Sequence, residues 1–165
     1  MKRYVLGLII SEYRSFVVLQ EKTHPEWQRG CMNGIGGHVD DGESYDAAMI
    51  REAREETTIY DEYPDNVWEH FATIADPGVF EMYCFRTFVA DVRLIDAHDG
   101  EERLTFVSVR ELPYQPVIGN LHWLIPFALD KHVRIPQLFN EQTRAPNVRV
   151  ASQHPASAAE GRSGV

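Results

Sequence analysis

Three glutamates and an arginine lie close together in the middle of the chain. Glu52, Glu55 and Glu56 follow Arg51 within one short segment. At about 100° per residue, the three glutamates share one face of a helix. Carboxylate oxygens bind hard divalent cations such as Mg²⁺, which also take substrate phosphates and water as ligands. The spacing therefore predicts a site for metal-assisted chemistry on phosphates.

A solvated acidic face on an ordinary surface helix is the alternative for these residues taken alone. Glu52 and Glu56 are a like-charge pair four residues apart, which costs about 0.2–0.5 kcal/mol. Both lie toward the C-terminal end of the predicted helix, where the helix dipole disfavours anions. A bound divalent cation would remove both penalties. The glycine-rich loop before the helix would let backbone carbonyls approach such an ion.

The elements that must position these residues indicate a mixed α/β domain. Ser44 is a typical N-cap for a helix that runs to about Thr57 or Thr58. Strands are predicted where apolar residues cluster or alternate, over residues 2–11, 15–20, 67–75, 80–92 and 104–109. A second helix is predicted over 120–131, with Trp123 in the core. Strands on both sides of a capped helix favour an α/β fold.

Length and charge fit one domain and exclude several functions. The 165 residues include 16 Lys plus Arg and 25 Asp plus Glu, for a net charge of −9, which argues against binding duplex nucleic acid. No apolar run reaches the roughly 18 residues of a membrane span, and the start of the chain has no signal-peptide cleavage pattern. The chain has only Cys31 and Cys84, too few for a disulfide framework, so we expect a reducing, cytoplasmic location. We also expect a monomer or homodimer without membrane contact. A domain over 1–140 is predicted, followed by a flexible tail over 141–165.

The pattern around the acidic helix resembles the Nudix box, Gly-x5-Glu-x7-Arg-Glu-U-x-Glu-Glu-x-Gly-U, in which U is aliphatic. Six fixed residues at these spacings arise by chance on the order of once in ten million starting positions. Thr58 stands where the box has its second glycine, which usually ends the helix. The resemblance implies a Nudix-type α/β/α sandwich with a mixed central sheet. The chain matches the box at Gly37, Glu43, Arg51, Glu52, Glu55, Glu56 and Ile59.

The resemblance implies a metal-binding role for four of these residues. Glu52, Glu55 and Glu56, together with the carbonyl of Gly37, match the family's Mg²⁺-binding set, and Mn²⁺ is expected to substitute. One of the glutamates, most often the one that matches Glu52, helps to deprotonate the attacking water.

Other positions are implied to support the metal site. Arg51 matches the arginine that orients the carboxylates by bidentate hydrogen bonds, and Glu43 contacts that arginine. A further acid from a loop often completes the site in the family. Glu101 is the first candidate for that acid and Glu102 the second. Two exposed loop acids without a role are the alternative.

Residues outside the box look like those of the branch that cleaves nucleoside triphosphates. Asn33, in Asn33-Gly34-Ile35-Gly36-Gly37, matches an asparagine that contacts the base in that branch. Asn120 precedes a helix that looks like the branch's final helix, and Gly119 and Asn120 stand where the branch has an acidic pair that reads the base. We therefore expect both amides to contact the base, since an amide offers a donor and an acceptor. His38 is a candidate phosphate contact, with plain solvent exposure as the alternative.

The function implied is a Mg²⁺-dependent Nudix pyrophosphohydrolase. It would cleave a nucleoside triphosphate, such as the modified deoxynucleotide 8-oxo-dGTP, to the monophosphate and pyrophosphate. Bound Mg²⁺ lowers the pKa of water and screens phosphate charge, so that an acidic site can admit a polyphosphate. Hydrolysis of ADP-ribose or another nucleoside diphosphate derivative is one alternative. A non-catalytic nucleotide-binding regulatory domain is another, which the retention of Arg51 with all three glutamates argues against.

Overall fold

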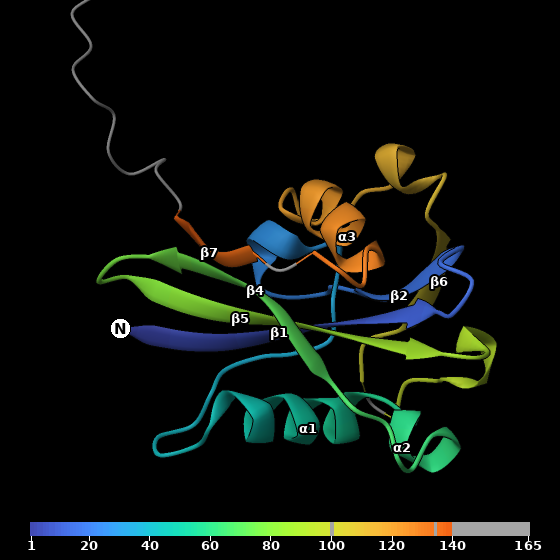
Figure 1. Cartoon of the computed structure of the whole chain (residues 1–165), viewed down its shortest axis with the longest axis horizontal. Helices are drawn as coiled ribbons and strands as arrows, with labels where there is room; N and C mark the ends of the chain where they lie inside the picture. Colours follow the sequence, from blue (N-terminus) through green and yellow to red (C-terminus); the bar gives the residue numbers. More distant parts are fainter. Residues whose placement is uncertain (100, 134, 140–165) are drawn as a thin grey trace, which may run out of the picture.

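A central mixed sheet has helices on both of its faces (Figure 1). The protein is described by a computed structural model over residues 1–99, 101–133 and 135–139, so the predicted tail over 141–165 lies outside the described residues. In this part of the chain the sheet has seven strands in the order β3-β2-β1-β5-β4-β7, with β6 paired to β2. The predicted α/β fold class is confirmed. No helix in the described part of the chain is long and apolar enough to cross a membrane.

The strands and helices follow one another as the sequence pattern predicts, with a few additions. The strands are β1 (Lys2–Ser11), β2 (Phe16–Glu21), β3 (Met32–Asn33), β4 (Glu69–Asp76), β5 (Phe80–Val89), β6 (Leu104–Ser108) and β7 (Ile135–Phe139). The helices are α1 (Tyr45–Glu56), α2 (Ile59–Glu62) and α3 (Leu121–Leu129). Single 3₁₀ turns occupy Glu26–Gln28, Val92–Leu94 and Leu112–Tyr114.

The pairing of β1 with β5 forms the centre of the sheet. These strands run parallel, in register from the Lys2–Phe80 pair to the Ser11–Val89 pair. On one side β4 pairs antiparallel with β5 and parallel with β7. On the other side β2 pairs antiparallel only with the end of β1, through the pairs Ile9–Val18 and Ile10–Val17. The two strands therefore diverge toward the start of β1.

The glycine-rich segment after β3 fills the gap between β1 and β2. Ile35 and Gly7 exchange backbone hydrogen bonds of 2.6 and 3.0 Å, and His38 bridges Tyr4 nearer the start of β1. Gly36 adopts a φ of +138°. A Cβ at this position would collide with the carbonyl oxygen of Val5, so only glycine can make this approach. The segment is thereby held alongside β1.

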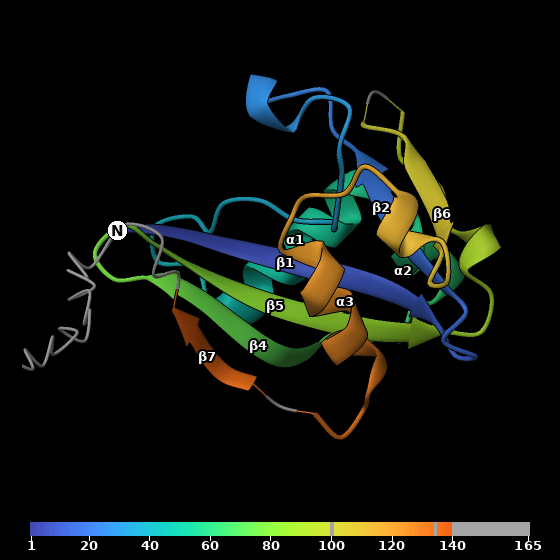
Figure 2. The same ribbon diagram turned by 90° about the horizontal axis from the view of Figure 1, so that it is seen from above.

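Two cores lie on opposite faces of the sheet. Figure 2 shows α3 lying over the sheet, and its buried residues join the upper core. The lower core packs the apolar face of α1, with Ala48, Met49 and Ala53 fully buried against β1 and β5. The small side chain of Ala53 lets the helix sit close to the sheet. Glu52 and Glu56 lie on the flank of α1 beside the glycine-rich segment, whereas Glu55 is exposed.

Several details differ from the sequence expectations. The strand predicted to reach residue 92 ends at Val89, because the Asp91 side chain accepts the Arg93 N–H and caps a 3₁₀ turn. Trp123 was expected in the core, but 37% of it is exposed. The buried face of α3 instead consists of Leu121, Leu124, Ile125 and Ala128. The two-residue β3 and the Pro-containing β7 were not predicted, because neither has a clear alternation.

Candidate active site

The start of α1 is fixed by a local cap. The Ser44 hydroxyl oxygen accepts the N–H of Ala47 at 3.2 Å, and Asp46 lies in the first turn, where the helix dipole favours an acid. This confirms the predicted helix start. From here the helical period places Glu52 and Glu56 on the side that faces the glycine-rich segment.

Arg51 is the hub of the acidic face. Its Nε and Nη2 donate to the two carboxylate oxygens of Glu43, each at 3.1 Å, and its Nη1 donates to Glu52 Oε1 at 2.9 Å and Glu55 Oε2 at 3.1 Å. Nη2 also donates to the carbonyl oxygen of His38 at 2.8 Å. These contacts raise the pKa of Arg51 above its ordinary value, and the hydrogen bonds with Glu43 contribute the largest part of the rise. One guanidinium thus orders three carboxylates and the preceding loop.

The hydrogen bonds of Glu43 favour its charged form. Its hydrogen bonds with the Arg51 guanidinium and then with the Asp40 N–H lower its pKa. The backbone is fixed as well, since Arg3 Nη2 donates to the Glu43 carbonyl oxygen at 2.6 Å. Glu43 therefore fixes the position of Arg51.

Gly37 and Glu52 lie in direct contact. A Cβ on Gly37 would lie 2.7 Å from Glu52 Oε1, so a side chain at this position would displace the carboxylate. The Gly37 carbonyl oxygen accepts the Val5 N–H at 3.0 Å, which leaves its second lone pair for another partner. Burial raises the pKa of Glu52, and Arg51 opposes that shift. The predicted carbonyl and carboxylate ligands are thus brought together.

Glu56 is a half-buried acid that makes no ion pair among the described residues. Its Oε2 accepts the N–H of Gly36 at 2.9 Å. Burial nevertheless raises the pKa of Glu56 to about 7, and this N–H, the charge of Lys22 and the amide of Gln20 offset only part of that rise. A carboxylate in this position would gain from a nearby positive charge.

The donor set fits a hard divalent cation. Three carboxylates and one backbone carbonyl are oxygen donors, as Mg²⁺ and Mn²⁺ prefer. In the described residues no three His, Cys, Asp or Glu side chains converge on one point, because Arg51 draws Glu52 and Glu55 toward itself. A cation would therefore bind with a small reorientation of the exposed Glu55 away from Arg51.

Thr58 replaces the box glycine without a left-handed turn. Thr57 closes α1 in an extended conformation, with φ of −141°, and its hydroxyl donates to the Ala53 carbonyl oxygen at 2.7 Å. The Thr58 N–H donates to the carbonyl oxygen of Asp96, and the Thr58 hydroxyl oxygen accepts the Asp96 N–H, at 2.9 and 3.0 Å. Thr58 therefore joins the helix end to the loop that precedes β6.

This loop carries the two candidate acids, which differ in their surroundings. Glu101 is exposed, and its N–H donates to His98, whose own N–H donates to the Glu56 carbonyl oxygen at 3.3 Å. Glu102 pairs with Lys22 Nζ at 2.6 Å and accepts the Thr23 hydroxyl at 2.7 Å. Glu101 thus lies on a loop attached to the end of α1, whereas Glu102 already has partners. Glu101 as a metal ligand stays a prediction.

The two predicted base contacts come from adjacent segments. Met32 bridges Val117, so the stretch before α3 runs beside β3. Asn33 Oδ1 accepts the Gly34 N–H at 2.9 Å, while Asn120 Oδ1 is buried without a hydrogen-bond partner among the described residues. The exposed His38 packs against the Tyr4 ring at 4.4 Å between centroids. The base and phosphate roles of these residues stay predictions.

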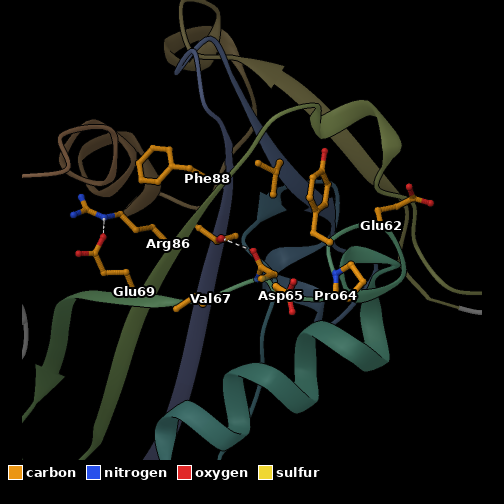
Figure 3. A pocket seen from close by; sticks show the side chains of 11 residues that line it. Glu62, Pro64, Asp65, Val67, Glu69, Arg86 and Phe88 are labelled. Carbon is orange, nitrogen blue, oxygen red and sulfur yellow. Dashed lines mark hydrogen bonds and ion pairs between the residues drawn. The ribbon is translucent and has the colours of Figure 1, made fainter.

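A separate pocket of about 540 Å³ lies at the neighbouring ends of β4 and β5 (Figure 3). None of the predicted site residues lines it. Its fully buried Arg86 donates to Glu69 at 2.9 Å and to the carbonyl oxygens of Ala128, Asp130 and Lys131. Arg86 therefore anchors the end of α3. Sequence reasoning missed it, and its one signal was an arginine within an apolar strand.

Comparison with known proteins identifies the family. The chain matches the family model described as NUDIX domain over residues 1–124. No curated protein matches it. Among solved structures, a NUDIX hydrolase from Nitrosomonas europaea has a TM-score of 0.59 at 15% identity, over 84% of this chain and 79% of that one.

Two further structures show the same fold. The mutator MutT protein from Bacillus halodurans has a TM-score of 0.56 at 20% identity, over 84% of this chain and 90% of that one. The NUDIX domain of Shewanella oneidensis NrtR, complexed with ADP ribose, has a TM-score of 0.61 at 16% identity, over 75% of this chain and 83% of that one. These likenesses confirm the Nudix-type fold. With the family match and the ordered box residues, the chain belongs to the Nudix family of hydrolases acting on phosphoric anhydrides.

Proposed function

We propose that the protein hydrolyses a nucleoside triphosphate to the monophosphate and pyrophosphate, with Mg²⁺ or Mn²⁺ bound at the acidic face of α1. The observation that carries the proposal is the arrangement around Arg51, which orders Glu43, Glu52 and Glu55 beside the half-buried Glu56. On a solvated acidic face without a function, Glu52 would not be buried and the pKa of Glu56 would not rise to about 7.

The residues present divide the work of such a reaction. When bound, a divalent cation would lower the pKa of a water molecule and screen the phosphate charge. Glu52, Glu55, Glu56 and the Gly37 carbonyl would hold the cation. Glu52 Oε2 is the atom that we propose takes the proton of the attacking water, because Arg51 engages the other oxygen. Arg51 keeps that carboxylate oriented.

The amides of Asn33 and Asn120 support a nucleotide with a purine-like base. They come from paired segments, and the Asn120 oxygen is a buried acceptor without a partner among the described residues. A base with a hydrogen-bond donor on its edge would satisfy that acceptor. We propose a modified deoxynucleotide such as 8-oxo-dGTP as the first substrate to test.

ADP-ribose is the second candidate, because a structural neighbour is a NUDIX domain complexed with ADP ribose. One panel separates the two. Canonical and oxidised nucleoside triphosphates, ADP-ribose and dinucleoside polyphosphates are incubated with Mg²⁺, and pyrophosphate is scored against orthophosphate. Pyrophosphate from a triphosphate supports the proposal. Turnover of ADP-ribose alone would replace it, and binding without turnover would indicate a regulatory domain.

A further inference from the structure

Gln20 presents an unusual feature beside the active site. Its side chain is fully buried, and Nε2 has no hydrogen-bond partner among the described residues. A buried amide donor without a partner costs about 1–3 kcal/mol. Such groups are rare in native structures, and one that persists calls for an explanation in terms of function.

The position of Gln20 on the sheet turns its side chain toward α1. Gln20 shares a face of β2 with Val18, which belongs to the lower core between the sheet and α1. It pairs across the sheet with Asn33 on β3 and with Leu104 on β6. The amide lies beside the Glu56 carboxylate, close enough to stabilise its charge, although it is not aligned into a hydrogen bond.

The other end of the same side chain holds a cation. Lys22 Nζ donates to Gln20 Oε1 at 2.8 Å and pairs with Glu102 Oε2 at 2.6 Å. Lys22 is near enough to Glu56 to act on its charge. An ammonium released from Gln20 could move onto Glu56, where it would compete with a divalent cation for the same oxygens.

We propose that Gln20 is a positioning residue of the metal site. Its carbonyl keeps Lys22 turned toward Glu102 and away from Glu56, and its free N–H faces Glu56 and aligns on that carboxylate when a cation is bound. This inference rests on the proposed function, because it gives Glu56 the role of a metal ligand.

Gln20→Leu provides the test, read by Mn²⁺ binding to the full chain without nucleotide. Free Mn²⁺ is followed by electron paramagnetic resonance, and the thermal midpoint is measured in chelator. We expect Mn²⁺ to bind about tenfold more weakly, as for other residues that orient metal ligands. The midpoint should stay unchanged or rise, because the substitution removes an unsatisfied buried donor.

A second variant shows whether the effect passes through Lys22. If a released ammonium competes for Glu56, then Lys22→Met added to Gln20→Leu should restore most of the lost Mn²⁺ affinity. Thr87→Val is the matched control, since Thr87 is a buried polar residue of β5 whose hydroxyl donates to Asn66 Oδ1 at 2.6 Å. It should lower the midpoint and leave Mn²⁺ affinity unchanged.

The outcomes distinguish a failure of the Gln20 proposal from a failure of the proposed metal site. A lowered midpoint with unchanged Mn²⁺ affinity in Gln20→Leu would show a purely structural role and overturn the proposal. If Glu56→Gln still weakens Mn²⁺ binding in that case, the metal site stands without Gln20. If Mn²⁺ binding survives in both variants, the proposed metal site fails as well. Gln20→Met, which is similar in length, gives the same test if the leucine variant does not fold.

Discussion

Glu56 and Glu102 are two shielded carboxylates near the same lysine, and their environments are opposite. Burial would raise the pKa of Glu102, but hydrogen bonds from Lys22 and from the Thr23 N–H and hydroxyl together lower it to about 2. Burial raises the pKa of Glu56 to about 7, and its protein partners do not reverse that. The charge of Glu102 is fully compensated by its protein partners, whereas the charge of Glu56 is compensated only in part.

The difference separates a structural acid, Glu102, from Glu56, the acid that we propose binds a metal ion. Lys22 could have neutralised Glu56, but it is held by Glu102 and Gln20 instead. The chain therefore keeps beside Glu52 a carboxylate whose charge a divalent cation at the proposed site would stabilise. Variants of the two acids should behave in opposite ways.

The largest expected difference is in catalysis. Glu56→Gln and Glu55→Gln should each lower kcat by about a thousandfold or more, because each removes a charged ligand of the proposed metal site while the fold survives. Glu102→Gln should change kcat by less than about tenfold, because Glu102 is engaged by Lys22 and Thr23. Steady-state hydrolysis with saturating Mg²⁺ measures all three. Equal losses at Glu56 and Glu102 would remove the distinction between them.

The Glu56→Gln substitution should stabilise the metal-free protein, although it lowers kcat. The folded pKa of about 7 lies above the unfolded value of about 4.3, so ionisation costs stability as the pH rises between them. In chelator at pH 8, Glu56→Gln should therefore raise the free energy of unfolding by about 2 kcal/mol. The gain should vanish below about pH 4.5. Urea unfolding at both pH values checks this, and a loss at pH 8 would contradict it.

Glu102 should show the reverse dependence with a smaller amplitude. Its folded pKa of about 2 lies below the unfolded value of about 4.3, so its stabilisation is complete above the unfolded value. Glu102→Gln should lower the free energy of unfolding by about 1–2 kcal/mol at pH 7. The difference from the unsubstituted chain should shrink as the pH falls from about 4.3 to 2. A difference that stays constant with pH would assign the effect to packing.

The smallest effect is expected at the base. Asn33→Ala should raise KM by about threefold to tenfold for bases that its amide contacts and less for others, with kcat nearly unchanged. The comparison uses the purine and pyrimidine triphosphates that the protein cleaves. A rise of equal size for every base would deny Asn33 a role in base recognition.

The sequence was sufficient for the box and for the helix that carries it. Ser44 and the helical period were enough to place the glutamates on one face, because local hydrogen bonds and side-chain spacing fix both. The α/β class followed from the strand pattern. Its topology did not, since the glycine-rich segment between β1 and β2 depends on pairing between distant residues.

The network behind the box could not be predicted. The Lys22–Glu102 pair joins residues 80 positions apart, and Gln20 has no recognisable spacing to Glu56. Thr58 stands where the box has glycine, and its side chain is hydrogen-bonded to the N–H of Asp96. Only the tertiary fold brings these two residues together, so the sequence could not predict how Thr58 fits at the helix end. Contacts of this kind follow from tertiary packing rather than from local pattern.

A crystal structure of the protein with Mn²⁺ and a non-hydrolysable nucleoside triphosphate analogue would test the metal site most directly. We predict anomalous density for Mn²⁺ between Glu52, Glu56 and the Gly37 carbonyl, in contact with the phosphates and with Glu55 released from Arg51. A nucleotide bound without an ion at these oxygens, with Glu52 and Glu55 still on Arg51, would contradict the proposal that the acidic face of α1 is a catalytic cation site.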